Sequence, residues 1–478
     1  MKSRSLVAAA VAAACFSGGA HATNWLQLQG TEPSGIAAPF KLFGFIQPTY
    51  ENAGGTPVTG LTPATSPFNG QVPKFNRVAP NATSSQSFNM LRARIAVRGT
   101  VTPISNKINY FIMAEFGNNG YTVNNGSYTP RLTDASVTFN QIPGARVRVG
   151  LFKTPGPEEV LQGIPDFDYI NFTNVSTQLI LNQFVQGLAY APTSGATQGV
   201  GPGGYLVTPA PINAGRDQGV QVFDWFNTGP WQFAYAAMIG NGAPLYANNT
   251  SHSMDYYGRL QESYIFHHSK GPHQAGVTAW VWGHLGHQAL DVAQGTSGGF
   301  TQQTYTYKRY GVGAQIRTGF MSPGAFRVTG EFMRGTGWIM APAAFSQPTN
   351  GTTPPCGASA GAGGTALCTE TLYPGGNNAA QGGYIEGGVF LTKHWDIEAR
   401  YDQYDRLTNS PALERVFKTT TLGVQYYFSP FARITFNYAI NRIGIPHLSA
   451  IKAAARGNAQ AVANAKDNVI ALQTTLFF

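Results

Sequence analysis

The connections between the predicted strands of this chain alternate between short and long. Side chains alternate between apolar and polar in roughly sixteen segments bounded by turn residues, and this period of two predicts β-strands. The segments cover residues 40–51, 87–99, 105–117, 130–140, 144–153, 216–227, 231–240, 254–266, 273–284, 304–318, 324–335, 382–391, 395–405, 416–427, 432–441 and 467–478. Most are close to the length of about 9–11 residues that a tilted membrane-spanning strand needs.

Short connections follow the even-numbered segments, for example "TPISN", "QIPG", "TGP", "MSPG" and "SPF". Long connections follow most odd-numbered segments: Asn52–Gln86, Thr154–Gly215, Leu285–Gln303, Thr336–Gln381 and Arg442–Lys466. A soluble β-sandwich has no reason to sort its connections in this way, whereas a membrane barrel has short periplasmic turns and long outer loops. The pattern therefore predicts an all-β, transmembrane up-and-down antiparallel β-barrel of about 16 strands.

The composition agrees with a membrane barrel. Charged residues make up 11% of the chain and aromatic residues 12%, against a usual charged share of about 25%. No window after the N-terminal segment contains the roughly 20 apolar residues of a transmembrane helix. Lipid-facing and lumen-facing residues alternate in a barrel, so its mean hydropathy stays near neutral. A soluble exported β-protein is the alternative.

The N-terminus "MKSRSLVAAAVAAACFSGGAHATNW" has the pattern of a secretory signal peptide. A positive start precedes the apolar run Leu6 to Phe16, and Ala20-His21-Ala22 is a small-residue cleavage site. We expect residues 1–22 to be removed, 23–39 to be a periplasmic N-terminal segment and 40–478 to be the barrel.

The three cysteines have separate interpretations. Cys15 lies in "VAAAC", which faintly resembles a lipoprotein cleavage box, but Ala12 stands where a larger apolar residue is usual. Cys356 and Cys368 lie in a Gly/Ala-rich loop. An oxidising compartment favours a disulfide between them, and two free thiols are the alternative. No third or fourth ligand has a spacing that suits a metal site.

The last segment, "NVIALQTTLFF", ends the chain at Phe478. Its apolar residues share one face, and a terminal aromatic of this kind is typical of the signal read by the barrel-assembly machinery. An ordinary edge strand is the alternative, but it would leave backbone groups unpaired. Pairing with the first strand would remove that edge.

Arginines alternate with apolar residues in "NMLRARIAVRGT" and in "ARVRVGL". An arginine on the lipid face costs about 2–4 kcal/mol at the bilayer midplane, so the basic faces are predicted to line the lumen. These arginines are Arg92, Arg94, Arg98, Arg146 and Arg148. The same alternation turns further charges inward: Arg309, Arg317, Arg327, Arg433, Glu115, Asp134, Glu331, Glu386, Asp396, Glu398 and Asp402.

The connection Thr154–Gly215 is about sixty residues long, too long for a structureless loop without a function. It follows Lys153 and carries Glu158, Glu159, Asp166 and Asp168. We expect it to fold into the pore and to hold these carboxylates opposite the arginines across a constriction, where fixed charges set ion selectivity. Alternatively, the charges form structural pairs, or the carboxylates cap strands or bind a cation at the loop base.

Several stretches resemble the phosphate-selective porin O/P family of Gram-negative outer membranes: "LRARIAVRG", "RVGLFKTP", "NGAPLY", "HWDIEARYDQYD", "TTLGVQYYFSPFARITFNYA" and "LQTTLFF". The resemblance implies a sixteen-stranded barrel, a homotrimer, a third outer loop folded into the pore and passive, anion-preferring diffusion. Loop lysines guide the anion in phosphate-selective members, but Thr154–Gly215 contains none. This departure favours a general or weakly anion-selective pore.

The sequence therefore predicts an outer-membrane porin for small hydrophilic solutes and ions. Phosphate or another oxyanion is a candidate solute. We expect no enzymatic activity, cofactor, metal or nucleic-acid partner; the expected partners are outer-membrane lipid, the assembly machinery and two further copies of the chain. One alternative is a barrel sheath around a periplasmic redox or secretion partner. The other is a barrel hydrolase, although "GTSGG" (Gly295–Gly299) lies in a loop rather than at a strand–helix elbow.

Overall fold

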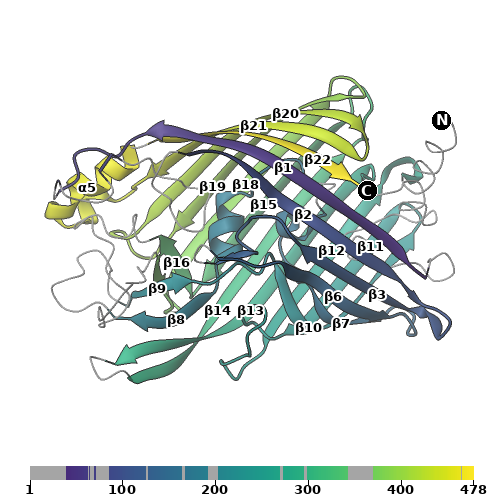
Figure 1. The fold of residues 1–478 in the computed structure, drawn as a ribbon, viewed down its shortest axis with the longest axis horizontal. Helices are drawn as coiled ribbons and strands as arrows, with labels where there is room; N and C mark the ends of the chain where they lie inside the picture. The colour runs from purple at the N-terminus through teal and green to yellow at the C-terminus, as the bar shows by residue number, and fades with distance from the viewer. Residues whose placement is uncertain are drawn as a thin grey trace.

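The computed structural model describes residues 39–62, 64, 69–70, 85–124, 127–163, 167–191, 203–269, 273–294, 299–342, 370–464 and 466–478. They form a closed antiparallel barrel of 16 strands, in which each strand pairs with the next (Figure 1). The barrel strands are β1 (Lys41–Thr56), β2 (Ser85–Val101), β3 (Ser105–Glu115), β6 (Arg131–Phe139), β7 (Arg146–Lys153), β10 (Arg216–Thr228), β11 (Trp231–Gly240), β12 (Asp255–Ile265), β13 (Gly276–Gln294), β14 (Gly299–Arg317), β15 (Phe326–Thr336), β18 (Ala379–Phe390), β19 (Trp395–Arg406), β20 (Arg415–Ser429), β21 (Ala432–Gly444) and β22 (Lys466–Phe477).

The predicted fold class and strand order are confirmed, with one correction. The segment Leu285–Gln303 was predicted as an outer loop, and this is wrong. β13 and β14 each have 19 residues and remain paired up to Gln294 and Gly299. Leu290 and Val292 are buried, because this extended hairpin packs against a second, smaller sheet.

The barrel closes where the two ends of the chain meet. β22 pairs with β1, with Phe477 opposite Phe45. The Gly44 amide donates to the Phe478 carbonyl at 2.9 Å, and the Phe478 amide donates to the Gly44 carbonyl at 3.1 Å. The last residue is therefore part of the hydrogen-bonded seam, and closure removes the sheet edges.

The outer face of the barrel is an apolar belt. Ile95 is 48% exposed, whereas its neighbours Arg94 and Ala96 are buried facing inward. Val312 and Ile385 are 53% and 57% exposed on distant strands of the same belt. A closed barrel with apolar side chains outward and polar ones inward is an outer-membrane barrel, because only closure satisfies its backbone in lipid. No helix among the described residues is long and apolar enough to cross a bilayer.

Aromatic pairs mark the periplasmic rim of this belt. Trp231 lies 4.9 Å from Tyr264, and Trp395 lies 4.8 Å from Tyr426, measured between ring centroids. Aromatic side chains commonly occupy the membrane interface in this way. Tyr427 is buried instead, because it has the opposite parity to Tyr426 on β20.

A smaller sheet lies near the outer ends of the barrel strands. It joins β8 (Val185–Tyr190) and β9 (Tyr205–Pro209) of the long loop to β17 (Glu370–Tyr373) and β16 (Ile339–Pro342), which follow β15. Its apolar core includes Trp338, Met340, Leu372 and Val207. We call these four strands the mouth sheet.

The remaining elements are short. They are β4 (Val123–Asn124), β5 (Ser127–Tyr128), α3 (Glu158–Leu161), the π-helix η2 (Ser176–Leu181), the 3-10 helices η3 (Phe266–His268) and η4 (Leu448–Ala450), and α5 (Ala453–Asn464). α5 lies in the last outer loop, where the chain is rich in alanine, a residue that favours helix.

Candidate pore constriction

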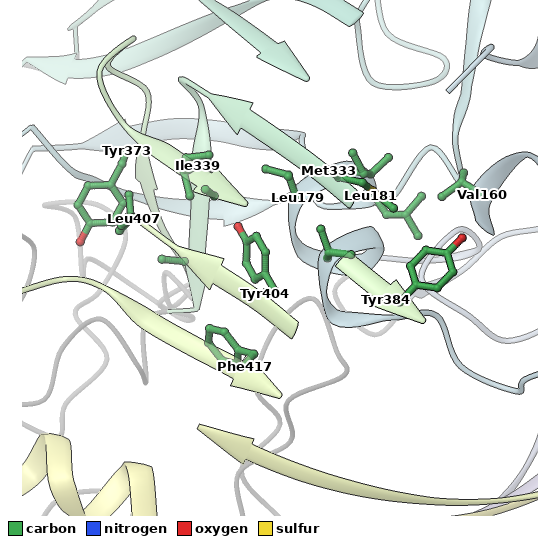
Figure 2. Packing of buried hydrophobic residues seen from close by; sticks show 14 of the residues in the cluster. Val160, Leu179, Leu181, Met333, Ile339, Tyr373, Tyr384, Tyr404, Leu407 and Phe417 are labelled. Carbon is green, nitrogen blue, oxygen red and sulfur yellow. The ribbon is translucent and has the colours of Figure 1, made fainter. Parts of the chain in front are cut away.

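The long loop after β7 packs inside the barrel. Val175, Leu179 and Leu181 are almost completely buried, and they form one apolar cluster with wall side chains such as Met333 and Tyr404 (Figure 2). Complete burial of a leucine side chain contributes roughly 1.5–3 kcal/mol. The loop is therefore fixed to the inner wall formed by β13, β15 and β18–β21.

The first two carboxylates of the loop pair with arginines of this wall. Glu158 forms an ion pair with Arg259 of β12, whose guanidinium also donates to the Gly156 carbonyl at 2.8 Å. Glu159 lies 3.2 Å from Arg400 of β19 and is itself buried. Both carboxylates are thus engaged at the start of the loop.

The third described carboxylate, Asp168, pairs with Arg327 of β15. Arg327 also contacts Asp396 at 2.7 Å and Glu398 at 3.0 Å, so one guanidinium joins three carboxylates. Burial opposes ionisation of Asp168, but the positive charges of Arg327, Arg317 and Arg433 hold its pKa below the ordinary value. Asp168 is therefore an anion whose charge is compensated locally.

Hydrogen bonds, rather than ion pairs, hold the middle of the loop. The Asn174 side chain donates to Asp402 and to Thr419, both at 2.7 Å. The Ile170 amide donates to the Asn437 side chain at 2.9 Å. These partners lie on β19, β20 and β21, so three adjacent strands position the same segment.

The facing wall is basic. We call it the basic wall, and it comprises Arg92, Arg94, Arg146, Arg148, Lys153 and Arg216 with the carboxylates Glu115, Asp134 and Asp224. Arg94 pairs with Glu115 at 2.7 Å, Arg216 with Asp134 at 3.0 Å and Arg146 with Asp224 at 2.8 Å. Cations outnumber carboxylates within this group.

Arg92 differs from Arg94 because its described hydrogen bond and ring contact are both with uncharged side chains. It donates to the Gln47 side-chain oxygen at 2.9 Å and lies over the ring of Phe172, 5.7 Å from its centroid. Phe172 belongs to the long loop, so this contact joins the basic wall to the loop. Arg92 is therefore the member of β2 at which the loop and the basic wall meet.

The other predicted members of the constriction differ in exposure. The Arg146 side chain is 23% exposed, whereas Arg148 is fully buried against the ring of Phe223. Lys153 donates to the carbonyls of Leu161 and Gln162 at 2.9 and 2.7 Å, so it holds the end of α3. Arg98 lies over the ring of Phe43.

The loop carboxylates pair with other arginines than those expected. Glu158, Glu159 and Asp168 contact Arg259, Arg400 and Arg327, because the loop crosses the lumen and packs against β12, β15 and β19. The predictions for Asp166, Cys356 and Cys368 fall outside the described residues, as do those for residues 1–38.

Two arginines were missing from the predicted site. Arg259 precedes the exposed Leu260 on β12, so it points inward. Arg400 lies between the predicted inward residues Glu398 and Asp402, on the same face of β19. The same period of two that placed the acids of β19 would have placed Arg400 inward.

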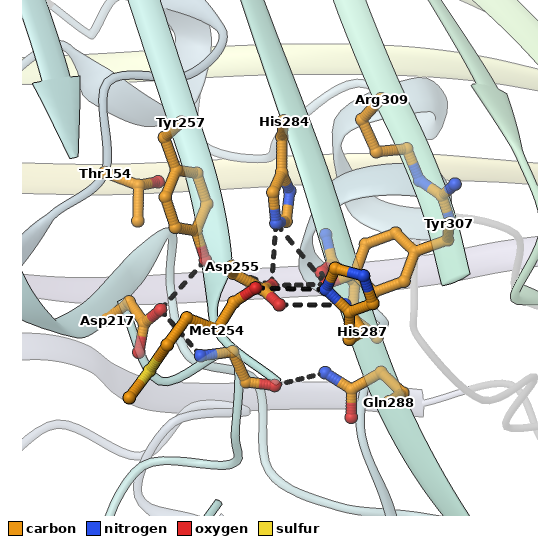
Figure 3. Close-up of polar contacts among 12 residues, drawn as sticks. Thr154, Asp217, Met254, Asp255, Tyr257, His284, His287, Gln288, Tyr307 and Arg309 are labelled. Atoms are coloured by element: carbon orange, nitrogen blue, oxygen red, sulfur yellow. Dashed lines mark hydrogen bonds and ion pairs between the residues drawn. The ribbon is translucent and has the colours of Figure 1, made fainter. Parts of the chain in front are cut away.

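A polar network lies at the outer end of β10, β12, β13 and β14 (Figure 3). Asp255 accepts a hydrogen bond from Tyr307 at 3.0 Å and lies 2.8 Å from the His284 Nε2. Tyr257 donates to Asp217 at 2.9 Å. His284 is therefore held on β13 by a buried carboxylate. Among the described residues, no group of histidines, cysteines and carboxylates could hold a metal ion.

Comparisons with known proteins found distant barrels. No protein-family model matches the chain, and no curated protein matches it. Among solved structures, an anion-selective porin from Comamonas acidovorans is 12% identical with a TM-score of 0.48, covering 92% of this chain and 99% of that chain. OmpF of Salmonella typhi is 11% identical with a TM-score of 0.48, and the outer membrane channel DcaP of Acinetobacter baumannii is 10% identical with a TM-score of 0.46. Both matches cover 92% of this chain and 97% of the other.

Proposed function

We propose that the protein is an outer-membrane porin that lets small hydrophilic solutes and ions diffuse passively, with a weak preference for anions. One observation carries the preference. The described loop carboxylates are each engaged by an arginine of β12, β15 or β19, whereas the basic wall has more cations than carboxylates. The excess fixed charge next to the loop is therefore positive, which attracts anions.

The proposal includes two narrower predictions. One is that the chain is related to the phosphate-selective porin O/P family, and the other is that it assembles as a homotrimer. Selectivity for phosphate would require cations that hold the anion directly. The segment Thr154–Gly215 contains no lysine or arginine, so the basic wall is the available source beside the loop. This arrangement supports a general anion preference more than binding of one oxyanion.

Conductance in planar bilayers tests the proposal. We expect ohmic single-channel steps. In a salt gradient, we expect a reversal potential with the sign of an anion-selective pore. Arg92→Ala with Arg94→Ala should shift that potential toward cations, because it removes two wall cations. Lys393→Ala, at an exposed periplasmic turn, is the matched control. A wild-type protein that never conducts would refute the porin, and an unchanged potential in the double variant would refute the role of this wall.

The two alternatives fit the geometry less well. A sheath needs an open lumen, but a loop packs against the inner wall here. A hydrolase of the triad type needs a carboxylate on one histidine nitrogen and a nucleophile on the other. In the His284 network, Asp255 at 2.8 Å and Tyr307 at 3.5 Å both meet Nε2, and Tyr307 is 1% exposed. This arrangement does not present an accessible nucleophile.

A further inference from the structure

Three basic side chains stand on the lipid side of the barrel. Lys308, Arg334 and Lys418 are exposed and point outward, since their neighbours Arg309, Met333 and Phe417 are buried facing inward. Arg442 has the same outward parity on β21 and is partly exposed. An outward cation within the membrane core is costly, so its depth and surroundings need a physical explanation.

These cations lie just beyond the outer rim of the apolar belt. Arg334 is the cross-strand partner of Tyr310, which is 46% exposed, and Lys308 follows two residues farther out on β14. Lys418 pairs with Gln403, two residues beyond Tyr401 of the same belt. Tyrosines typically mark the level of the lipid head groups. The four cations therefore lie at head-group height on the outer side.

The cations form two like-charged pairs. Lys418 lies directly opposite Arg442 across β20 and β21. Lys308 and Arg334 are diagonal neighbours across β14 and β15, because Lys308 pairs with Thr336 and Arg334 with Tyr310. Like charges directly opposite each other in a sheet are destabilising unless an anion lies between them.

No described salt bridge joins a carboxylate to either pair. Arg442 donates to Asn468 at 3.1 Å, a neutral partner. Asp405 is the acidic position nearest to Lys418 in the strand register, but its carboxylate accepts from Gln403 at 2.9 Å. The described salt bridges do not include Lys308, Arg334 or Lys418.

We propose that these four residues bind phosphate groups on lipid head groups of the outer leaflet, one phosphate at each cation pair. Phosphate esters supply the anion that each pair lacks, and the lipid chains would lie along the apolar belt below. The two pairs are separated by β18 and β19, so their inner members Arg334 and Lys418 are three strand spacings, or about 14 Å, apart. That span suits a large glycolipid head group with more than one phosphate.

Binding of a defined glycolipid to purified, delipidated full-length protein tests this. The probe is diphosphorylated lipid A in neutral detergent micelles, and the readout is its Kd by native mass spectrometry or thermal shift. Lys308→Gln with Lys418→Gln removes one member of each pair and should weaken binding roughly tenfold to thirtyfold. The matched control, Lys107→Gln with Lys393→Gln, removes two exposed lysines at the periplasmic end of the barrel, one at the start of β3 and one in the turn before β19.

Two further probes separate the sources of phosphate. Fully dephosphorylated lipid A of the same acyl content should bind wild type as weakly as diphosphorylated lipid A binds the variant. Inorganic phosphate at the same concentration should not compete. Equal affinity of wild type and variant, equal binding of the dephosphorylated lipid, or competition by inorganic phosphate would each overturn the proposal. Conductance is not part of this readout, so the result stands apart from the porin proposal.

Discussion

Arg92 and Arg94 share one face of β2 but differ in their partners. Arg94 is neutralised by Glu115, which is fully buried. The hydrogen-bond partner of Arg92 is the neutral amide of Gln47. The same residue type on the same face therefore has two roles: Arg94 is a member of a structural ion pair, and Arg92 is a cation whose described hydrogen bond goes to a neutral side chain.

Single substitutions should separate these two roles. Arg92→Gln should shift the reversal potential toward cations and change the free energy of unfolding by less than about 1 kcal/mol, since both side chains are polar. Arg94→Gln should lower the free energy of unfolding by about 3–5 kcal/mol, because Glu115 stays buried without its partner. Denaturant unfolding and bilayer recordings measure the two effects. Equal destabilisation by both variants would contradict this division.

The faces of the arginines could be predicted from the sequence, but their partners could not. A period of two fixes whether a strand residue points to lipid or lumen. Glu158 and Arg259 are 101 residues apart, and Glu159 and Arg400 are 241 apart. Such pairings depend on the path of the loop across the lumen, which no local pattern encodes.

At the scale of elements, Arg327 is the central anchor of the loop. It joins Asp168 of the loop to Asp396 and Glu398 of β19. Arg327→Met should remove the cation that contacts all three carboxylates, at a cost of about 3–5 kcal/mol. We expect the loop to detach, with noisier single-channel currents and faster proteolysis within 154–215. Lys393→Met is the control, and steady currents in Arg327→Met would contradict the anchoring role.

The mouth sheet should depend on pH through Glu370. Burial raises the pKa of Glu370 to about 8, against the opposing effects of the hydrogen bond from Asn182 and the charge of Arg406. Because this pKa is raised, folding favours the protonated form. Its stabilisation is complete below the ordinary pKa of about 4.3 and is lost as the pH rises through about 8.

Hydrogen exchange can measure this effect. After correction for intrinsic rates, amides of β9 and β17 should exchange faster at pH 9 than at pH 6. Glu370→Gln keeps the hydrogen-bonding shape without the charge and should remove the difference. Faster exchange at pH 6 than at pH 9 in the wild type would give the opposite sign and refute the assignment.

At the scale of the whole molecule, the barrel closes at the β1–β22 seam, which includes Phe478. Phe478 makes both of its backbone hydrogen bonds with Gly44 at the β1–β22 seam. Deletion of Phe478 should lower the yield of folded barrel, because the β1–β22 seam loses two backbone hydrogen bonds. The fraction that resists unfolding in detergent on a gel without heating measures this. Phe436→Ala, an exposed aromatic away from the terminus, should fold normally.

The topology of the barrel could be predicted because connection lengths alternate along the entire chain. That signal is global and tolerates errors of a few residues at each strand end. It failed at β13 and β14, where the strands continue beyond the level of their neighbours. The mouth sheet could not be predicted either, since its strands are 4 to 6 residues long and pair across large distances in sequence.

The mouth sheet has a consequence for engineering the pore. β9 of the long loop pairs with β17, which lies in the loop after β15. The two paired strands are more than a hundred residues apart in the sequence. Exchanging only one of these loops with another barrel would leave the other with an exposed strand edge, prone to pairing with foreign chains. The two loops therefore form one structural unit, and an exchange between barrels should move both loops together.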